Sequence, residues 1–340
     1  MSDAKDQRPI DRIRDSAFSM QIGAPEDGRV CTMVDMGSSL YAVKERAVYA
    51  VQLADEVDPK RTNIAVPNTQ QRLLSLGARN PEVARIFLTA HTLFKATYLG
   101  KDFPERKARR LAFGYLKDIA AMMEIHSSLV AASEHAVAGL SEVVAKDRSL
   151  NLPSLGNAEE RCDAFAQKVG HAIDTLKAIA RLFYAKELSK KWIDSLASLA
   201  EQRYGEEAPV ARFMREVRGN LLFMREIRNM IEHPQEAAYV RVHDFHLSPS
   251  MELVAPCVEI VRRGEVPVSE TLASFMVQII EELVSVGEMF IALLCGANVT
   301  SFSGFPLVVA DIPPSRRPEW NPHQQMSYGI VMNGEVHPIG

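Results

Sequence analysis

The stretch VSETLASFMVQIIEELVSVGEMFIALLC, residues 268–295, is the most apolar helical pattern in the chain. Its apolar side chains recur every three or four residues and form one broad face: Leu272, Phe275, Met276, Ile279, Ile280, Leu283, Val286, Met289 and Phe290. A face this wide predicts a helix buried against several others. The greasiest part, residues 289–299, is too short for a membrane span, which needs about 20 residues. We therefore expect a core helix and no association with a membrane.

The same three- and four-residue spacing predicts further helices upstream. They are expected at residues 38–58, 80–99, 104–144, 158–185, 188–204 and 210–232, with a short helix near residues 69–76. Pro234 ends the helix at 210–232, because proline cannot continue a helix and pushes the preceding residue out of the α region.

One segment changes period and interrupts this helical pattern. Residues 239–247 are β-branched and aromatic, and a second such run, at 252–260, follows the turn residues Ser248, Pro249 and Ser250. Together they predict a β-hairpin, in which Pro256 marks an edge or a bulge. The expected fold is mainly α: a helical bundle with a small β-hairpin inserted before the last long helix.

The expected organisation has four parts. Residues 1–37 form a loose N-terminal arm with one strand at 29–34, and residues 38–146 form an N-terminal helical region. After a boundary at 147–157, residues 158–296 form the helical bundle, with the hairpin at 239–260. Residues 297–340 form an irregular C-terminal tail with short strands, rich in glycine and proline.

Composition excludes several classes of protein. The net charge of −4 provides no global field that would attract nucleic acid or acidic lipid. The four cysteines, at positions 31, 162, 257 and 295, are scattered, which indicates a reducing compartment rather than a disulfide framework or a zinc site. With a charged N-terminus that lacks an apolar run, they predict a cytoplasmic location. No cofactor-binding or metal-binding motif is found. His243 and His246, three apart on a predicted strand, are expected on opposite faces.

One short motif has the residues needed for chemistry: RNMIEH, residues 228–233. An arginine binds phosphate oxygens bidentately, and a histidine transfers protons near neutral pH. Together they can cleave RNA without a metal, because His233 exchanges protons with ribose oxygens while Arg228 stabilises the charge on the phosphate. Five Arg–His pairs have a similar separation: 85/91, 228/233, 241/246, 316/323 and 317/323. Only 228/233 combines an asparagine with the end of a helix.

The geometry of a helix end favours this pair. Residues five apart on a regular helix lie about 140° apart around its axis, so Arg228 and His233 would diverge if the helix continued. Because Pro234 ends the helix, the imidazole is free to turn back toward the arginine. Asn229 can orient the ring, and Glu232 can hold the guanidinium in competition with phosphate.

Residues 228–233 resemble the motif of the HEPN domain family, in which an arginine precedes a histidine by four to six residues and a polar residue often follows the arginine. The resemblance implies a helical bundle that acts as a metal-independent endoribonuclease, often a toxin or defence effector. It also implies a homodimer, whose two motifs share one cleft, and a nucleotidyltransferase-type partner protein. On this basis Arg228, Asn229 and His233 are the expected catalytic residues.

Three further arginines, Arg215, Arg218 and Arg225, line a stripe on the same helix that leads to His233. They either follow the RNA backbone or form an ordinary solvated face. Two other hypotheses stay open for the whole chain. It is a HEPN-like dimeric module that binds or regulates without cleaving, or an unrelated helical scaffold in which the motif caps a helix and holds the hairpin.

Overall fold

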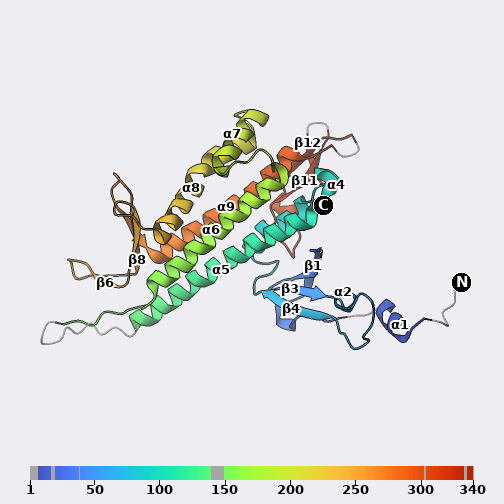
Figure 1. The fold of residues 1–340 in the computed structure, drawn as a ribbon, viewed down its shortest axis with the longest axis horizontal. Coiled ribbons are helices and arrows are strands. Elements are labelled where there is room, and N and C mark those ends of the chain that lie inside the picture. The colour runs from blue at the N-terminus through green and yellow to red at the C-terminus, as the bar shows by residue number, and fades with distance from the viewer. Residues whose placement is uncertain are drawn as a thin grey trace. The chain divides into compact units, whose positions relative to one another are not determined.

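The computed structural model describes residues 7–16, 20–37, 39–138, 149–301, 304–332 and 335–339. The chain divides into two compact units. The first comprises Met1–Arg110 and Val299–Gly340, and the second comprises Leu111–Asn298. The chain passes from the first unit to the second within helix α5 (Glu105–Ala138) and returns after helix α9 (Leu272–Asn298) (Figure 1).

The first unit contains a four-stranded antiparallel sheet in the order β1-β2-β3-β4. Its strands are β1 (Val30–Asp35), β2 (Leu40–Lys44), β3 (Val48–Gln52) and β4 (Thr69–Leu74). Val34, Ala42, Val43, Val48 and Val51 are buried in this part of the unit. Three short helices accompany the sheet: α1 (Pro9–Asp15), η1 (Pro25–Asp27) and α2 (Ala54–Val57).

This sheet corrects two predicted helices. Residues 38–58, expected as a helix, form β2, β3 and the short α2, and residues 69–76 contain the strand β4. Strands β2 and β3 are β-branched and aromatic, and side chains on both of their faces are buried. Such strands carry apolar residues at spacings that also fit a helix. A tight turn, closed by the bond from Lys44 N–H to Ala47 C=O (2.8 Å), joins the two strands and lets them pair antiparallel instead of forming one helix. The strand expected at residues 29–34 is confirmed as β1.

The helix predicted at residues 80–99 is broken into three parts. A π-helical segment, η2 (Val83–Leu88), leads into α3 (Thr89–Leu93), and α4 (Ala96–Leu99) follows after two non-helical residues. Lys95 has extended backbone angles, φ −122° and ψ 122°, so it separates α3 from α4.

The C-terminal segment forms a three-stranded antiparallel sheet that belongs to the first unit. It consists of β10 (Leu307–Asp311), β11 (Met326–Met332) and β12 (Glu335–Pro338), with η3 (Pro314–Arg316) after β10. Tyr328 of β11 donates a hydrogen bond to the carbonyl of Leu93 (2.6 Å), and Gln324 donates to the hydroxyl of Thr92 (2.9 Å). These bonds fasten the end of the chain to α3. The short strands expected in this segment are present, but they form a three-stranded sheet rather than an irregular tail.

The second unit is largely helical. With the larger part of α5, it contains α6 (Ala158–Phe183), α7 (Trp192–Tyr204), α8 (Pro209–Glu232) and α9. Helix α6 packs against α8 and α9, and the hydroxyl of Tyr115 on α5 donates to the carbonyl of Leu283 on α9 (2.6 Å). These helices match the expected ranges to within a few residues. The expected end of α5 near residue 144 and the start of the boundary at 147 lie outside the described residues.

The predicted hairpin is part of a larger β region. Strands β5 (Tyr239–His243) and β8 (Cys257–Val261) pair antiparallel, and β9 (Val268–Thr271) adds a third strand. Between β5 and β8, the short strands β6 (His246–Leu247) and β7 (Leu253–Val254) form a separate ladder. Residues 268–271, expected at the start of the last helix, therefore belong to the sheet.

The expected mainly α fold is wrong. The described residues give 50% helix and 19% strand, the latter in four antiparallel sheets, so the protein is mixed α and β. Most of the error lies in the first unit, where the strands β2, β3 and β4 were expected to be helical. No helix among the described residues is long and apolar enough to cross a membrane.

Candidate functional site

Helix α8 carries the RNMIEH motif on its last turn. The helix begins at Pro209, a favoured residue in the first turn, and its apolar residues are buried at three- and four-residue spacing up to Met230. It ends where the N–H of His233 bonds to the carbonyl of Asn229 (2.8 Å). His233 has φ −137° and ψ 65°, outside the α region. The predicted helix end before Pro234 is confirmed.

Arg228 is held in place along its stem. A Cβ atom at Gly170 of α6 would lie 3.4 Å from Cδ and Nε of Arg228, so the glycine leaves just enough room for the arginine. The Nε atom is buried and has no hydrogen-bond partner among the described residues. At the tip, Nη2 lies 2.8 Å from Oε2 of Glu232, with 40% of the arginine side chain exposed. The stem of the Arg228 side chain is therefore packed in place, while the end of the guanidinium is accessible to solvent.

Asn229 and His233 are both exposed. Within the described part of the chain, neither side chain has a hydrogen-bond partner, so the structure brings the three motif residues to one helix end without joining them. Arg228 is paired with Glu232 instead of facing His233. In this ion pair, Glu232 holds the guanidinium of Arg228, and it occupies the position that a phosphate would take.

The electrostatic surroundings of Glu232 are acidic. Burial, followed by the nearby carboxylates of Glu159, Glu160 and Glu232, raises the pKa of Asp163 on α6. Burial is the larger cause of this shift, and the three carboxylates add to it. A phosphate that approaches Arg228 competes with Glu232 for the guanidinium.

The arginine stripe on α8 is only partly available. Arg215 donates to the carbonyl of Glu206 (2.7 Å), and Arg218 forms an ion pair with Asp194 of α7 (2.6 Å). Arg225 is exposed, and no ion-pair partner stands beside it among the described residues. Two of the three arginines thus bind protein oxygens within the unit, which is what an ordinary solvated helix face shows.

Two histidines predicted on opposite faces of a strand lie together. The rings of His243 and His246 are 5.8 Å apart, because β5 ends at His243 and the chain bends before β6 begins. Asp244 fixes the bend by accepting bonds from the hydroxyl of Ser154 (2.6 Å) and the N–H of Leu155 (2.9 Å). Burial alone would raise the pKa of Asp244, but these and neighbouring bonds hold it below its usual value. The described residues contain no group of three or more histidine, cysteine or acidic side chains arranged to hold a metal.

A shallow groove of about 210 Å³ lies on the second unit between α8, β9 and α9; we call it the α8–α9 groove. Its floor is apolar and consists of Phe223, Met224, Phe275 and Ile279. Its rim is polar and consists of Asn220, Glu270, Gln278 and Glu282. Three of the floor residues also line a small internal void of about 10 Å³ against the stem of Arg228.

Sequence reasoning did not find this groove. Asn220 and Arg228 lie eight residues apart on α8, which is close to two helical turns, so a shared face was detectable. Glu270, by contrast, belongs to a strand whose residues were assigned to the last helix. Its place opposite α8 follows only from the pairing of β9 with β8.

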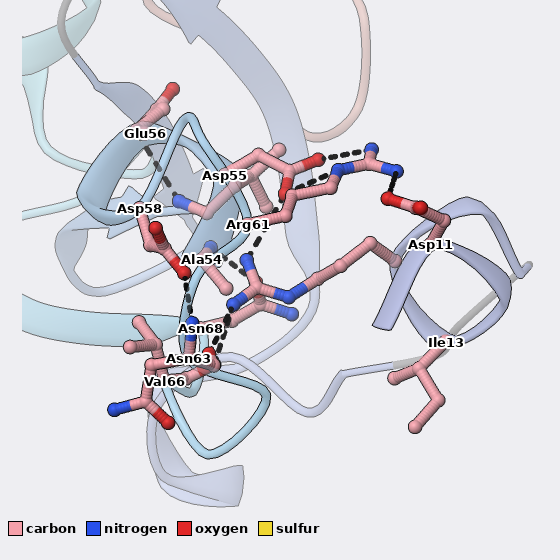
Figure 2. Close-up of polar contacts among 12 residues, drawn as sticks. Asp11, Ile13, Ala54, Asp55, Glu56, Asp58, Arg61, Asn63, Val66 and Asn68 are labelled. Carbon is pink, nitrogen blue, oxygen red and sulfur yellow. Dashed lines mark hydrogen bonds and ion pairs between the residues drawn. The ribbon is translucent and has the colours of Figure 1, made fainter. Parts of the chain in front are cut away.

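The first unit has a cluster of ion pairs that holds α1 (Figure 2). Arg61 binds Asp55 (2.8 Å), Asp15 (2.8 Å) and Asp11 (3.3 Å), so it joins α1 to α2. Arg14 of α1 donates to Asp55 (3.1 Å) and to the carbonyls of residues 63 and 66 (3.3 Å each). Its side chain is only 7% exposed. Because both arginines are already bound by protein oxygens, the cluster is a structural attachment rather than an anion site.

Comparison of the chain with protein-family models, with curated proteins and with solved structures gave no match.

Proposed function

We propose that this protein is a metal-independent endoribonuclease of the HEPN type that acts at the C-terminal end of α8. The observation that carries the proposal is the placement of Arg228 and His233. The arginine stem is anchored against Gly170, while the guanidinium tip and the imidazole five residues later are open to solvent. An anchored cation beside a free proton-transfer group suits the cleavage of a phosphodiester.

In the proposed reaction, the ribose 2′-oxygen attacks the adjacent phosphorus and the bond to the 5′-oxygen breaks. His233 takes the proton of the 2′-hydroxyl, and Arg228 binds the phosphate oxygens as their charge grows. The leaving 5′-oxygen takes up a proton, which the protonated His233 returns. The products end in a 2′,3′-cyclic phosphate and a 5′-hydroxyl. Asn229 assists by orienting the imidazole ring.

The proposal includes the setting in which the enzyme works. The chain forms a homodimer that brings two motifs into one cleft, and RNA is the substrate. It acts in the cytoplasm as a toxin or defence effector, controlled by a nucleotidyltransferase-type partner protein. The resemblance of residues 228–233 to the HEPN motif supports these points.

Incubation of the purified protein with mixed RNA in EDTA tests the proposed function. General acid–base catalysis contributes roughly 100- to 10,000-fold, so His233→Ala is expected to reduce the cleavage rate by that factor while RNA binding stays similar. Arg228→Lys keeps the charge but loses the bidentate fork, and it is expected to slow cleavage substantially. His171→Ala, a matched change of an exposed histidine on α6, is expected to leave the rate unchanged.

Cleavage that survives His233→Ala, or that EDTA abolishes, would contradict this mechanism. Mass spectrometry of the products provides an independent check, because a 3′-hydroxyl end instead of a cyclic phosphate would exclude attack by the 2′-oxygen.

A second candidate is a dimeric module that binds or regulates without cleaving. The ion pair between Arg228 and Glu232 favours it, since Glu232 competes with a phosphate for the guanidinium. If no RNA is cleaved under any condition tested, but the protein is dimeric and binds a partner, this function replaces the first.

A further inference from the structure

The α8–α9 groove combines an apolar floor with hydrogen-bonding groups at its rim. The side chains of Phe275 and Ile279 are 4% and 7% exposed, and Phe223 is half-buried beside them. A flat aromatic ligand gains most from such a floor, because it covers the apolar surface while its edge reaches the rim. A nucleobase has this shape and this division between face and edge.

The rim is rich in acceptors. Glu282 accepts a hydrogen bond from the Asn220 amide (2.9 Å), and Glu270 accepts one from the Gln278 amide (3.3 Å). Each carboxylate has further lone pairs for a ligand, since an ionised carboxylate offers about four acceptor positions. Two carboxylates repel phosphate, so the backbone of RNA does not bind here. The group that does cannot be an anion and must present hydrogen-bond donors.

The groove lies close to the motif. Asn220, Met224 and Arg228 occupy successive turns of α8, so the groove extends from about 6 Å to about 12 Å along the helix axis from the arginine. The void beside the Arg228 stem shares the floor residues Met224, Phe275 and Ile279 with the groove. A strand of RNA whose phosphate is at Arg228 can therefore place a base one or two nucleotides away in the groove.

We infer that the α8–α9 groove binds a guanine base of single-stranded RNA, an inference that rests on the proposed function. Guanine alone among the four bases presents two adjacent donors, N1–H and the N2 amino group, which match the two oxygens of one carboxylate. Adenine and cytosine present an amino group beside an acceptor ring nitrogen, and uracil presents one N–H between two carbonyls. A carboxylate at the rim therefore attracts the donor edge of guanine and repels the acceptor atoms on the edges of adenine, cytosine and uracil.

Nucleoside binding tests the groove without any need for cleavage. Guanosine and inosine, which differ by the N2 amino group, are titrated into the full-length protein and followed by saturation-transfer NMR. We expect guanosine to bind at least fivefold more tightly than inosine, and Glu282→Gln to remove that preference. Glu270→Gln provides a second variant on a different element. Glu281→Gln changes the neighbouring exposed carboxylate outside the groove and is the matched control.

Cleavage of RNA octamers that contain one guanine, one inosine or neither gives the second measurement. We expect the guanine octamer to be cut fastest, and the advantage to disappear in Glu282→Gln. If the three octamers are cut equally fast and the wild type binds guanosine no more tightly than inosine, the groove assignment is overturned while the proposed function stands. If guanosine binds as expected but no RNA is cut, the groove assignment stands and the endoribonuclease fails. No selective binding and no cleavage overturns both.

Discussion

At the scale of single residues, the ion pair between Arg228 and Glu232 decides how readily the motif binds an anion. Ion pairs four residues apart on a helix stabilise by only about 0.3–0.5 kcal/mol, so a phosphate can displace Glu232 at low cost. Glu232→Gln replaces the competing carboxylate with a neutral amide, so it removes the ion pair with Arg228 and one negative charge near Asp163. We expect it to tighten RNA binding about two- to fivefold at low salt, measured by filter binding with His233→Ala in the background.

Glu236→Gln is the control for that change, since Glu236 is an exposed carboxylate just beyond the helix end. Weaker binding in Glu232→Gln would mean that Glu232 positions the guanidinium rather than competing for it.

His91 of α3 gives the first unit a predicted dependence on pH. Burial, followed by the charges of Lys95 and Arg109, lowers the pKa of His91 from 6.5 to about 4. The unfolded chain therefore binds a proton between pH 6.5 and 4 that the folded chain refuses, so stability is full above pH 6.5 and falls as the pH drops toward 4. A shift of this size corresponds to a loss on the order of 3 kcal/mol.

Urea unfolding at pH 7 and pH 4.5 measures this loss. We expect His91→Gln to show a smaller drop in the unfolding midpoint between the two pH values than the wild type. An equal drop in both proteins would assign the acid sensitivity to other groups.

The chemistry of the motif was readable from the sequence, but its surroundings were not. The order Arg228, Asn229, His233, Pro234 indicates a helix end with a cation and a proton-transfer group, and the helix does end there. The ion pair with Glu232 was also foreseeable from four-residue spacing. The contact with Gly170 comes from α6, and only the packing of α6 against α8 brings it to Arg228.

At the scale of elements, α1 depends on one buried arginine. Arg14 is nearly enclosed, and it satisfies one carboxylate and two carbonyls of the loop after α2. Arg14→Ala leaves the carbonyl of residue 66 without its donor, which costs about 1–3 kcal/mol for a buried group, while Asp55 keeps Arg61. Because α1 has only seven residues and one buried apolar side chain, we expect that loss to release it.

Limited digestion with thermolysin measures the release of α1, since this protease cuts before Ile10 and Ile13 and its sites survive the substitution. We expect cleavage at least tenfold faster in Arg14→Ala than in the wild type, and little change in Arg12→Ala, the exposed neighbour. Equal rates for the two variants would show that the contacts in Figure 2 do not hold the helix.

Helices α6 and α8, each with a single buried stripe, were predicted well, whereas the strands β2 and β3, buried on both faces, were not. Helices α6 and α8 each alternate an apolar stripe with a charged face, which only a helical period fits. In β2 and β3, runs such as Ala42-Val43-Lys44 place buried side chains on both faces, so the period of two is hidden. Even Lys44 is buried there, because its ammonium donates to the carbonyls of Ile22 and Ala24 (2.7 and 2.8 Å).

At the scale of the whole molecule, the proposed homodimer needs a surface for the second copy. Helix α9 does not supply it, because most of its apolar side chains are buried within the second unit. Val268, the first residue of the edge strand β9, and Val266, just before the strand, are 58% and 85% exposed and offer an apolar alternative. We expect light scattering at micromolar concentration to give twice the monomer mass of 37.8 kDa.

Val268→Lys is expected to shift this mass toward the monomer, whereas Val30→Lys, on the edge strand β1 of the other unit, is expected to leave it unchanged. A wild-type mass of 37.8 kDa would contradict the dimer.

The nesting of the second unit between the two parts of the first has a consequence for biosynthesis. The tyrosine of β11 that fastens the C-terminal sheet to α3 is made long after Leu93, its partner. At 5–20 residues per second, a ribosome needs about 10–40 s to make the intervening 188 residues from 111 to 298. The second unit can therefore fold completely before the strands β10, β11 and β12, which complete the first unit, have been synthesised. A chaperone that protects the emerging chain would be needed most by the part that was synthesised first.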